Sequence, residues 1–205
     1  MVTAILTDFG KVVCDFNRDW VIAGFCSRLP GTPSEVIKEA LSGEKGRTLL
    51  REFECGSITE DDYARRLLSL MGVKGMGREK FWRIHVNMFT PNWDVIRLWQ
   101  ELQRVHGVKL VAVTDTDPRR LEYMKTISML KFDGVAASFM VGHQKPHESI
   151  FKLALEVAEV TPEQCIFVDD IEANVQAAEK LGINAITFSD APHLMHRLCH
   201  FGLVL

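Results

Sequence analysis

Three short apolar runs in this chain each stop at an acidic or hydroxyl residue, and this pattern constrains the fold more than any other feature. Runs of this length, rich in β-branched residues and separated by helix-length stretches, predict buried strands of a parallel sheet. In an open α/β sheet the ligand crevice lies beyond the carboxyl ends of the strands, so the polar residues would meet there. The runs and the residues that follow them are Ala4–Thr7 before Asp8, Lys109–Val113 before Thr114, and Cys165–Val168 before Asp169 and Asp170.

Strand-like and helix-like stretches alternate from about residue 108 to the end of the chain. Two further strands are expected near residues 133–138 and 184–188, each after a helix-like stretch. This alternation predicts an α/β fold, a Rossmann-like parallel sheet with helices on both faces.

The stretch between Asp8 and about residue 108 contains helix-like segments separated by turn residues, and no strand is expected in it. We therefore expect an inserted, all-helical cap domain formed by residues 16–90, directly after the first strand. The α/β core domain would then consist of residues 1–15 and 91–205.

The composition excludes several classes of protein. The 205 residues are 47% hydrophobic and carry a formal net charge of −3, which gives no electrostatic reason to expect nucleic acid or an acidic membrane as partner. The five cysteines lack CxxC spacing, which argues against a disulfide framework or a zinc site. Without a leader-like segment or a run of about 18 apolar residues, we expect a cytoplasmic protein. The arginine pairs Arg65–Arg66 and Arg119–Arg120 are interpreted as solvated helix charges.

The predicted clustering of three carboxylates, those of Asp8, Asp169 and Asp170, needs a physical explanation. Clustered negative charge is costly unless a cation, a phosphate or chemistry accounts for it. A hard divalent cation with oxygen ligands would make the cluster tolerable, and Mg²⁺ bridges carboxylates to phosphate in this way. Each residue alone has a simpler interpretation, because an aspartate after a strand is commonly a turn former or a helix cap.

Four motifs follow one another along the chain, namely Asp8-Phe9-Gly10-Lys11-Val12-Val13, Thr114, Lys145-Pro146, and Asp169-Asp170 followed by Asn174. They resemble the motifs of the haloacid dehalogenase superfamily, and the resemblance spans the whole chain, cap included. Within it, the chain is most similar to small sugar-phosphate phosphatases and to the amino-terminal phosphatase domain of soluble epoxide hydrolase. The stretch from Val168 to Ile183 carries much of that similarity.

The resemblance implies a Mg²⁺-dependent phosphatase that acts on a small phosphorylated metabolite. Asp8 would attack phosphorus to form an aspartyl-phosphate, which water then hydrolyses. The implied metal ligands are the Asp8 carboxylate, the Gly10 carbonyl oxygen and the Asp170 carboxylate. The implied catalytic and phosphate-binding residues are Asp8, Thr114, Asp115 and Lys145, with Asp169 and Asn174 in support.

Two positions depart from the family pattern. Relatives usually carry an aspartate where this chain has Gly10, and that aspartate protonates the leaving group. General acid catalysis typically raises the rate about 10²–10⁴-fold. Its loss favours substrates with good leaving groups, such as anomeric or acyl phosphates. Alternatively, the cap or a neighbour such as Lys11 or Asp15 supplies the proton. The second departure is Asp115, where relatives mostly carry asparagine. An added carboxylate near the phosphate is unfavourable unless it is paired or turned away.

Other functions remain open at this stage. One is a catalytically weak or silent binding or regulatory protein that kept the fold, which Gly10 and Asp115 favour. Another is a metal-independent haloacid dehalogenase, which the Asp169-Asp170 pair argues against because a metal-free site gains nothing from concentrated negative charge. Phosphotransfer to an acceptor other than water is a further alternative. The sequence leaves the substrate and the oligomeric state open.

Overall fold

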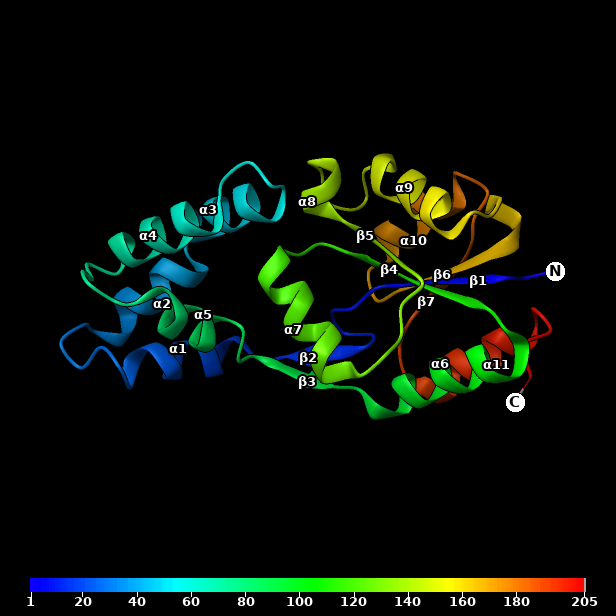
Figure 1. Ribbon diagram of the computed structural model, residues 1–205, viewed down its shortest axis with the longest axis horizontal. Coiled ribbons are helices and arrows are strands. Elements are labelled where there is room, and N and C mark those ends of the chain that lie inside the picture. The colour runs from blue at the N-terminus through cyan, green and yellow to red at the C-terminus, as the bar shows by residue number, and fades with distance from the viewer. Residues whose placement is uncertain (205) are drawn as a thin grey trace.

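The centre of the molecule is a parallel sheet of five strands. A computed structural model of the protein describes residues 1–204. The strands are β1 (Ala4–Thr7), β4 (Lys109–Thr114), β5 (Gly134–Ala137), β6 (Cys165–Asp169) and β7 (Asn184–Thr187). Their order in the sheet is β5-β4-β1-β6-β7, and every neighbouring pair is parallel (Figure 1). The strand that carries Asp8 is therefore central, with β4 on one side and β6 on the other.

Helices cover both faces of this sheet. Successive strand residues point to opposite faces, so Ile5 packs in one apolar cluster and Leu6 in the other. The first cluster includes α6 (Trp93–His106), α7 (Pro118–Ser128) and α11 (Ala191–Cys199). The second includes α9 (Glu148–Ala158) and α10 (Glu172–Glu179). Two short elements complete this part of the chain, α8 (Ser138–Val141) and a 3₁₀ turn (Pro162–Gln164).

A separate group of helices lies to the left in Figure 1, beyond α7. It buries its own apolar cluster, in which the rings of Phe53 and Tyr63 stack with centroids 4.6 Å apart. A hydrogen bond of 2.8 Å joins the Tyr63 hydroxyl to His85 Nε2 inside this cluster. The helices of this group are α1 (Arg18–Cys26), α2 (Ser34–Ser42), α3 (Glu44–Glu54), α4 (Glu60–Leu70) and α5 (Arg78–His85).

Two short strands connect the helical group to the sheet. β2 (Cys14–Phe16) and β3 (Phe89–Pro91) pair antiparallel where the chain leaves the sheet region and returns to it. The expectation of no strand between Asp8 and about residue 108 is therefore wrong. A strand of three residues is too short to show a recognisable alternation of apolar and polar residues in the sequence. Both strands of this two-stranded ribbon are edge strands, which is why Pro91 is tolerated in β3.

The predicted α/β fold, with helices on both faces of a parallel sheet, is confirmed. The expected strands near residues 133–138 and 184–188 are β5 and β7, each shorter than predicted. Within residues 1–204, no helix has both the length and the apolar character needed to cross a membrane.

Gly46 allows α3 to approach the end of α2, and Gly46→Ala is expected to destabilise the protein. A Cβ added at this position would collide with the backbone carbonyl oxygen of Ala40, which cannot swing aside as a flexible side chain would. We expect the free energy of unfolding to fall by about 1–3 kcal/mol, measured by urea denaturation. Gly77→Ala is the matched control, because a Cβ there meets nothing within 4 Å. An equal loss in both variants would contradict the packing argument.

Candidate active site

The strand order brings the polar strand ends to one edge of the sheet. Asp8 follows β1, Thr114 is the last residue of β4, and Asp169 is the last residue of β6. Asp8, Asp169 and Asp170 each offer a carboxylate oxygen, and these oxygens all lie within 4.8 Å of one another. The first two carboxylates are buried, whereas Asp170 is partly exposed. Asp8 is 161 positions before Asp169 in the chain, yet the three residues form a single acidic cluster.

Lys145 lies within this cluster and neutralises part of its charge. Its ammonium nitrogen is 2.8 Å from Asp8 Oδ1 and 2.7 Å from Asp169 Oδ2, and it donates to the Val113 carbonyl at 3.1 Å. Burial lowers the pKa of Lys145, but the charges of Asp8 and Asp169 outweigh burial and raise this pKa above its ordinary value. The lysine is therefore fully protonated and holds the ends of β1 and β6 together.

Asp169 is held by its neighbours on both carboxylate oxygens. Oδ1 accepts hydrogen bonds from the Ile171 backbone N–H at 2.8 Å and from the Asn174 amide at 3.0 Å. Oδ2 accepts from the same amide at 3.1 Å and from Lys145 at 2.7 Å. With three groups donating to it, Asp169 has little capacity left for a ligand, and it fixes the position of Lys145.

Asp8 is different, because among residues 1–204 only its Oδ1 has hydrogen-bond or ion-pair partners. That oxygen accepts from the Phe9 backbone N–H at 2.7 Å and contacts Lys145. Burial raises the pKa of Asp8 to about 7, against the lowering effect of Lys145, and the charge of Asp169 raises it further. Burial and the charge of Asp169 also raise the pKa of Asp170. The raised pKa values show that the charged forms of Asp8 and Asp170 are destabilised at this site, and their oxygens lie close together. Such a pair of carboxylates fits a hard divalent cation such as Mg²⁺.

A cavity of about 280 Å³ opens over these residues. Its volume is at the lower end of the roughly 300–1,000 Å³ that is typical of ligand pockets, so it suits a small molecule. The sequence-predicted residues that line it are Asp8, Gly10, Thr114, Asp115, Lys145, Asp170 and Asn174.

Both departures from the family pattern have a structural context. Asp115 accepts a hydrogen bond from the Lys145 backbone N–H at 2.9 Å, so it holds the loop that carries this lysine. Gly10 faces the cavity, and a Cβ added there would make only ordinary contacts, 3.7 Å from Phe16 and 3.9 Å from Asp8 Oδ2. Lys11 and Asp15 form an exposed ion pair of 3.3 Å with each other.

Glu54 and Arg120 line the cavity and Gln144 contacts Glu54, but none of these three residues was a candidate in the sequence. Arg120 is only 6% exposed, so its interpretation as a solvated helix charge is wrong. Its Nη1 lies 2.8 Å from Glu54 Oε1, and Gln144 donates to Glu54 Oε2 at 2.8 Å. Because Glu54 ends α3, this network joins the helical group to the sheet region. No local pattern marks Glu54 in the sequence.

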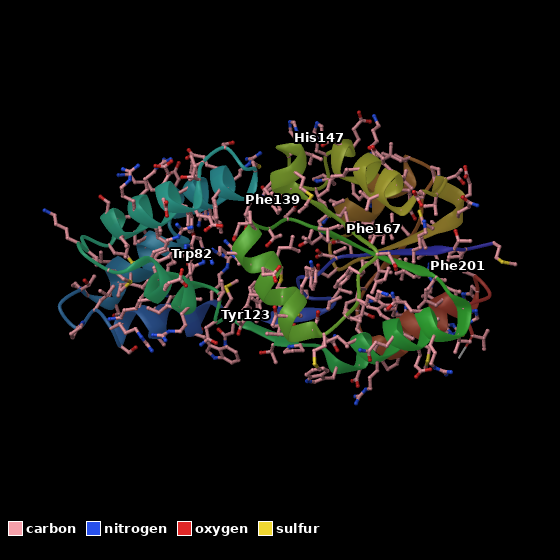
Figure 2. The ribbon with its side chains drawn as sticks, viewed as in Figure 1. Trp82, Tyr123, Phe139, His147, Phe167 and Phe201 are labelled. Atoms are coloured by element: carbon pink, nitrogen blue, oxygen red, sulfur yellow. The ribbon has the colours of Figure 1, made fainter. Side chains whose placement is uncertain are left out.

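A weak signal for Arg120 was present. Asp117 lies three positions earlier at the start of a helix, and its Oδ2 is 2.7 Å from Arg120 Nε. Acidic and basic residues at this spacing are neighbours on a helix, so an ion pair could have been expected. Arg119, the other member of the pair, reaches across to Glu60 at 2.7 Å and lies over the ring of Trp82. Figure 2 shows Trp82 on the side of the helical group that faces α7.

Comparison with known proteins identifies related sequences over most of the chain. A model of the family described as haloacid dehalogenase-like hydrolase matches residues 4–182. A D-ribitol-5-phosphate phosphatase of Bacteroides thetaiotaomicron is 23% identical over 191 residues, which cover 89% of this chain and 89% of that protein. A phosphorylated carbohydrates phosphatase of Thermotoga maritima is 33% identical over 120 residues, which cover 58% of this chain and 55% of that one.

Solved structures share the fold. One is a haloacid dehalogenase family enzyme from Bacteroides thetaiotaomicron, crystallised with magnesium and inorganic phosphate. It superimposes with a TM-score of 0.75 at 21% identity, covering 95% of this chain and 99% of that one.

Proposed function

Because the chain belongs to the haloacid dehalogenase-like hydrolase family, we propose that it is a Mg²⁺-dependent phosphatase of a small phosphorylated metabolite of the sugar-phosphate class. The observation that carries the proposal is the acidic cluster at the strand ends, with Lys145 inside it and Thr114 on the same cavity wall. The relatives named for D-ribitol 5-phosphate and for phosphorylated carbohydrates support the substrate class. We take residues 16–90 as a cap domain over this site and residues 1–15 and 91–205 as the core domain.

The proposed metal site uses Asp8, Asp170 and the Gly10 carbonyl oxygen. Asp169 is excluded as a principal ligand because its oxygens already accept from Lys145, Asn174 and a backbone N–H. When bound, Mg²⁺ would offset the repulsion between the carboxylates and the phosphate, which is worth roughly 1–4 kcal/mol for each pair of unit charges at about 4 Å.

The proposed reaction has two steps, both at phosphorus. A carboxylate oxygen of Asp8 attacks, the bond from phosphorus to the leaving oxygen breaks, and an aspartyl-phosphate forms. Water then attacks this phosphorus, which releases inorganic phosphate and regenerates the Asp8 carboxylate. Lys145 and the Thr114 hydroxyl stabilise negative charge on the phosphoryl oxygens as the transfer proceeds. With glycine at position 10, the leaving oxygen takes its proton from water.

The test is a phosphate-release assay with purified protein and Mg²⁺. The panel contains sugar 1-phosphates, polyol phosphates, acetyl phosphate and p-nitrophenyl phosphate, each with and without EDTA. We expect release from several of these compounds and its loss with EDTA, whereas a metal-independent dehalogenase would be insensitive to the chelator. Absence of release from the whole panel would favour the silent binding protein instead.

Mg²⁺ is expected to raise the melting temperature of the wild-type protein and to have little effect on Asp170→Asn. A ligand that binds only the folded state stabilises it by about 2.7 kcal/mol at a hundredfold excess over its dissociation constant. The measurement is a thermal melt at 0 and 10 mM MgCl₂, with CaCl₂ and NaCl of matched ionic strength as controls. Glu172→Gln, an acidic residue at the start of α10, serves as the matched variant and should respond like wild type. An equal shift in Asp170→Asn would rule this carboxylate out as a ligand.

Gly10→Asp is expected to raise kcat/KM for alkyl phosphates by about 10²-fold, because it adds a general acid beside the leaving oxygen. The space around Gly10 accepts a side chain, and its backbone is not in the left-handed region. Acetyl phosphate has a good leaving group, so its kcat/KM should change little. Gly10→Asn is the control that adds a similar volume without the acid. Equal effects of the two substitutions on alkyl phosphates would show that proton donation is not the missing element.

A further inference from the structure

Arg120 is a buried arginine whose hydrogen-bonding groups are only partly used. Its side chain is 7% exposed; Nη1 pairs with Glu54, and Nε with Asp117. Nη2 and Nε are buried, and neither makes a hydrogen bond of good geometry among residues 1–204, although the Tyr63 hydroxyl lies close to the guanidinium. An unsatisfied buried donor is costly, so an oxygen acceptor that the protein itself does not supply is expected at Nη2.

The position of Arg120 shows where such an acceptor would come from. Arg120 lines the cavity above Asp8, and so does Glu54. It also lines a second, smaller cavity of about 40 Å³ inside the helical group, which has room for about one water-sized group. Arg18 and Met88 line both cavities as well, so the two spaces adjoin. A ligand whose phosphate lies at Asp8 would direct its remaining atoms past Arg120.

The smaller cavity, inside the helical group, has both apolar and polar side chains in its wall. Val21, Leu41 and Leu50 line it together with Tyr63 and His85. The Tyr63 hydroxyl is joined to His85 Nε2, and His85 Nδ1 is buried without a hydrogen-bond partner in the described part of the chain. Burial and the positive charge of Arg120 lower the pKa of His85, so this ring is neutral. Neutral polar atoms of this kind suit hydroxyl groups rather than charged ones.

The charges around Arg120 likewise favour a neutral oxygen over an anion. Two carboxylates, Glu54 and Asp117, already face one guanidinium. A further anionic group would be repelled by both, whereas a hydroxyl group can accept from Arg120 Nη2 and donate to a Glu54 oxygen. A hydroxyl is both donor and acceptor, so it satisfies both partners of the pair at once.

We propose that Arg120 and Glu54 determine substrate specificity by binding a hydroxyl group of the leaving group, which selects sugar or polyol phosphates over phosphoesters without hydroxyl groups. This inference rests on the proposed phosphatase function and adds the residues that select the substrate. Glu54 comes from α3 and Arg120 from α7, so the hydroxyl subsite is complete only while the helical group contacts the sheet region.

The experiment compares two substrates with the same chain length and the same primary phosphoester, D-ribitol 5-phosphate and n-pentyl phosphate. The measured quantity is the ratio of their kcat/KM values. Wild-type protein should prefer the polyol phosphate by at least about 10-fold, because a hydrogen bond to a charged group is worth that much or more. A wild-type ratio near one would overturn the inference even if no variant folded.

Two variants test the residues. Arg120→Lys keeps the positive charge between the two carboxylates but cannot present the same fork of donors, and Glu54→Gln keeps the volume of the side chain. Each variant should reduce this ratio about 10-fold or more. The reduction should come mainly from a lower kcat/KM for D-ribitol 5-phosphate, while kcat/KM for n-pentyl phosphate should change less than about threefold. A merely structural role would lower both substrates equally and leave the ratio unchanged, which would contradict the proposal.

Arg119→Lys is the matched control, because this arginine pairs with Glu60 and does not line the cavity above Asp8. Its ratio should equal that of wild type, and an equal drop would mean that contact between the helical group and α7 suffices to explain the effect. Acetyl phosphate distinguishes failure of the specificity inference from failure of the proposed phosphatase function. Release from acetyl phosphate without preference for the polyol would overturn this inference alone, whereas no release from any of the three compounds would overturn the proposed function and this inference with it.

Discussion

Asp8→Asn is expected to lower phosphate release by about 10⁴-fold or more on every substrate that wild-type protein hydrolyses. The substitution removes the proposed nucleophile, without which no aspartyl-phosphate can form. Asparagine keeps the size of the side chain and can still accept from the Phe9 N–H, so the fold should persist. Burst kinetics and mass spectrometry provide the second measurement, because the phosphorylated intermediate seen with wild type should be absent.

The control for this substitution is Asp94→Asn, at an exposed aspartate in the first turn of α6 that pairs with Arg97. Its kcat should match that of wild type within about twofold, because exposed ion pairs contribute little. Residual activity of a tenth or more in Asp8→Asn, with an unchanged melting curve, would mean that another residue attacks phosphorus.

Lys145→Met is expected to cause the largest loss of stability among single substitutions at the site. It removes the ammonium group that contacts both Asp8 and Asp169, and it leaves these buried carboxylates without that partner. Breaking a buried ion pair from one side costs about 3–5 kcal/mol, so the free energy of unfolding should fall by that amount. The measurement is urea denaturation in EDTA, where no cation can replace the missing charge. Phosphate release should fall by about 10²-fold or more in addition, because charge on the transferred group loses a stabilising partner.

Lys152→Met is the matched control, since Lys152 pairs with Glu148 on an exposed helix surface. Its free energy of unfolding should change by less than about 1 kcal/mol. If Lys145→Met were as stable as this control, the carboxylates would not depend on Lys145 for their charge balance. The interpretation of Lys145 as the centre of the cluster would then be wrong.

The sheet could be predicted from the sequence because its strands are short, apolar and separated by helices. Buried parallel strands must be apolar on both faces, so Ile5 and Leu6 are equally informative although they pack in different clusters. The ribbon of β2 and β3 could not be predicted in this way, because its three-residue strands are half exposed and Pro91 suggested only an end to the helices. The family resemblance noted in the sequence is confirmed by the family match over residues 4–182.

The strand pattern alone predicted only the site residues at strand ends, whereas Lys145 and Asn174 were predicted through the family resemblance. Asp8, Thr114 and Asp169 have positions that follow from the sheet itself, so a sequence can place them on one edge. Glu54 and Arg120 meet through the packing of α3 against the region around α7 and α8, with 66 positions of chain between them. No periodic pattern or motif in the sequence marks such a contact. A buried arginine such as Arg120 therefore cannot be distinguished from a surface arginine by sequence alone.

The order of the strands also determines how the site is lost when the protein unfolds. β4, β1 and β6 are the three inner strands, so each has a hydrogen-bonded neighbour on both sides, while β5 and β7 form the edges. Local opening begins where the backbone has fewest neighbours, and the edges can fray without separating Asp8 from Asp169. Catalytic competence should therefore outlast the first exchange of amide protons at β5 and β7, and it should disappear only in the cooperative transition that melts the whole sheet.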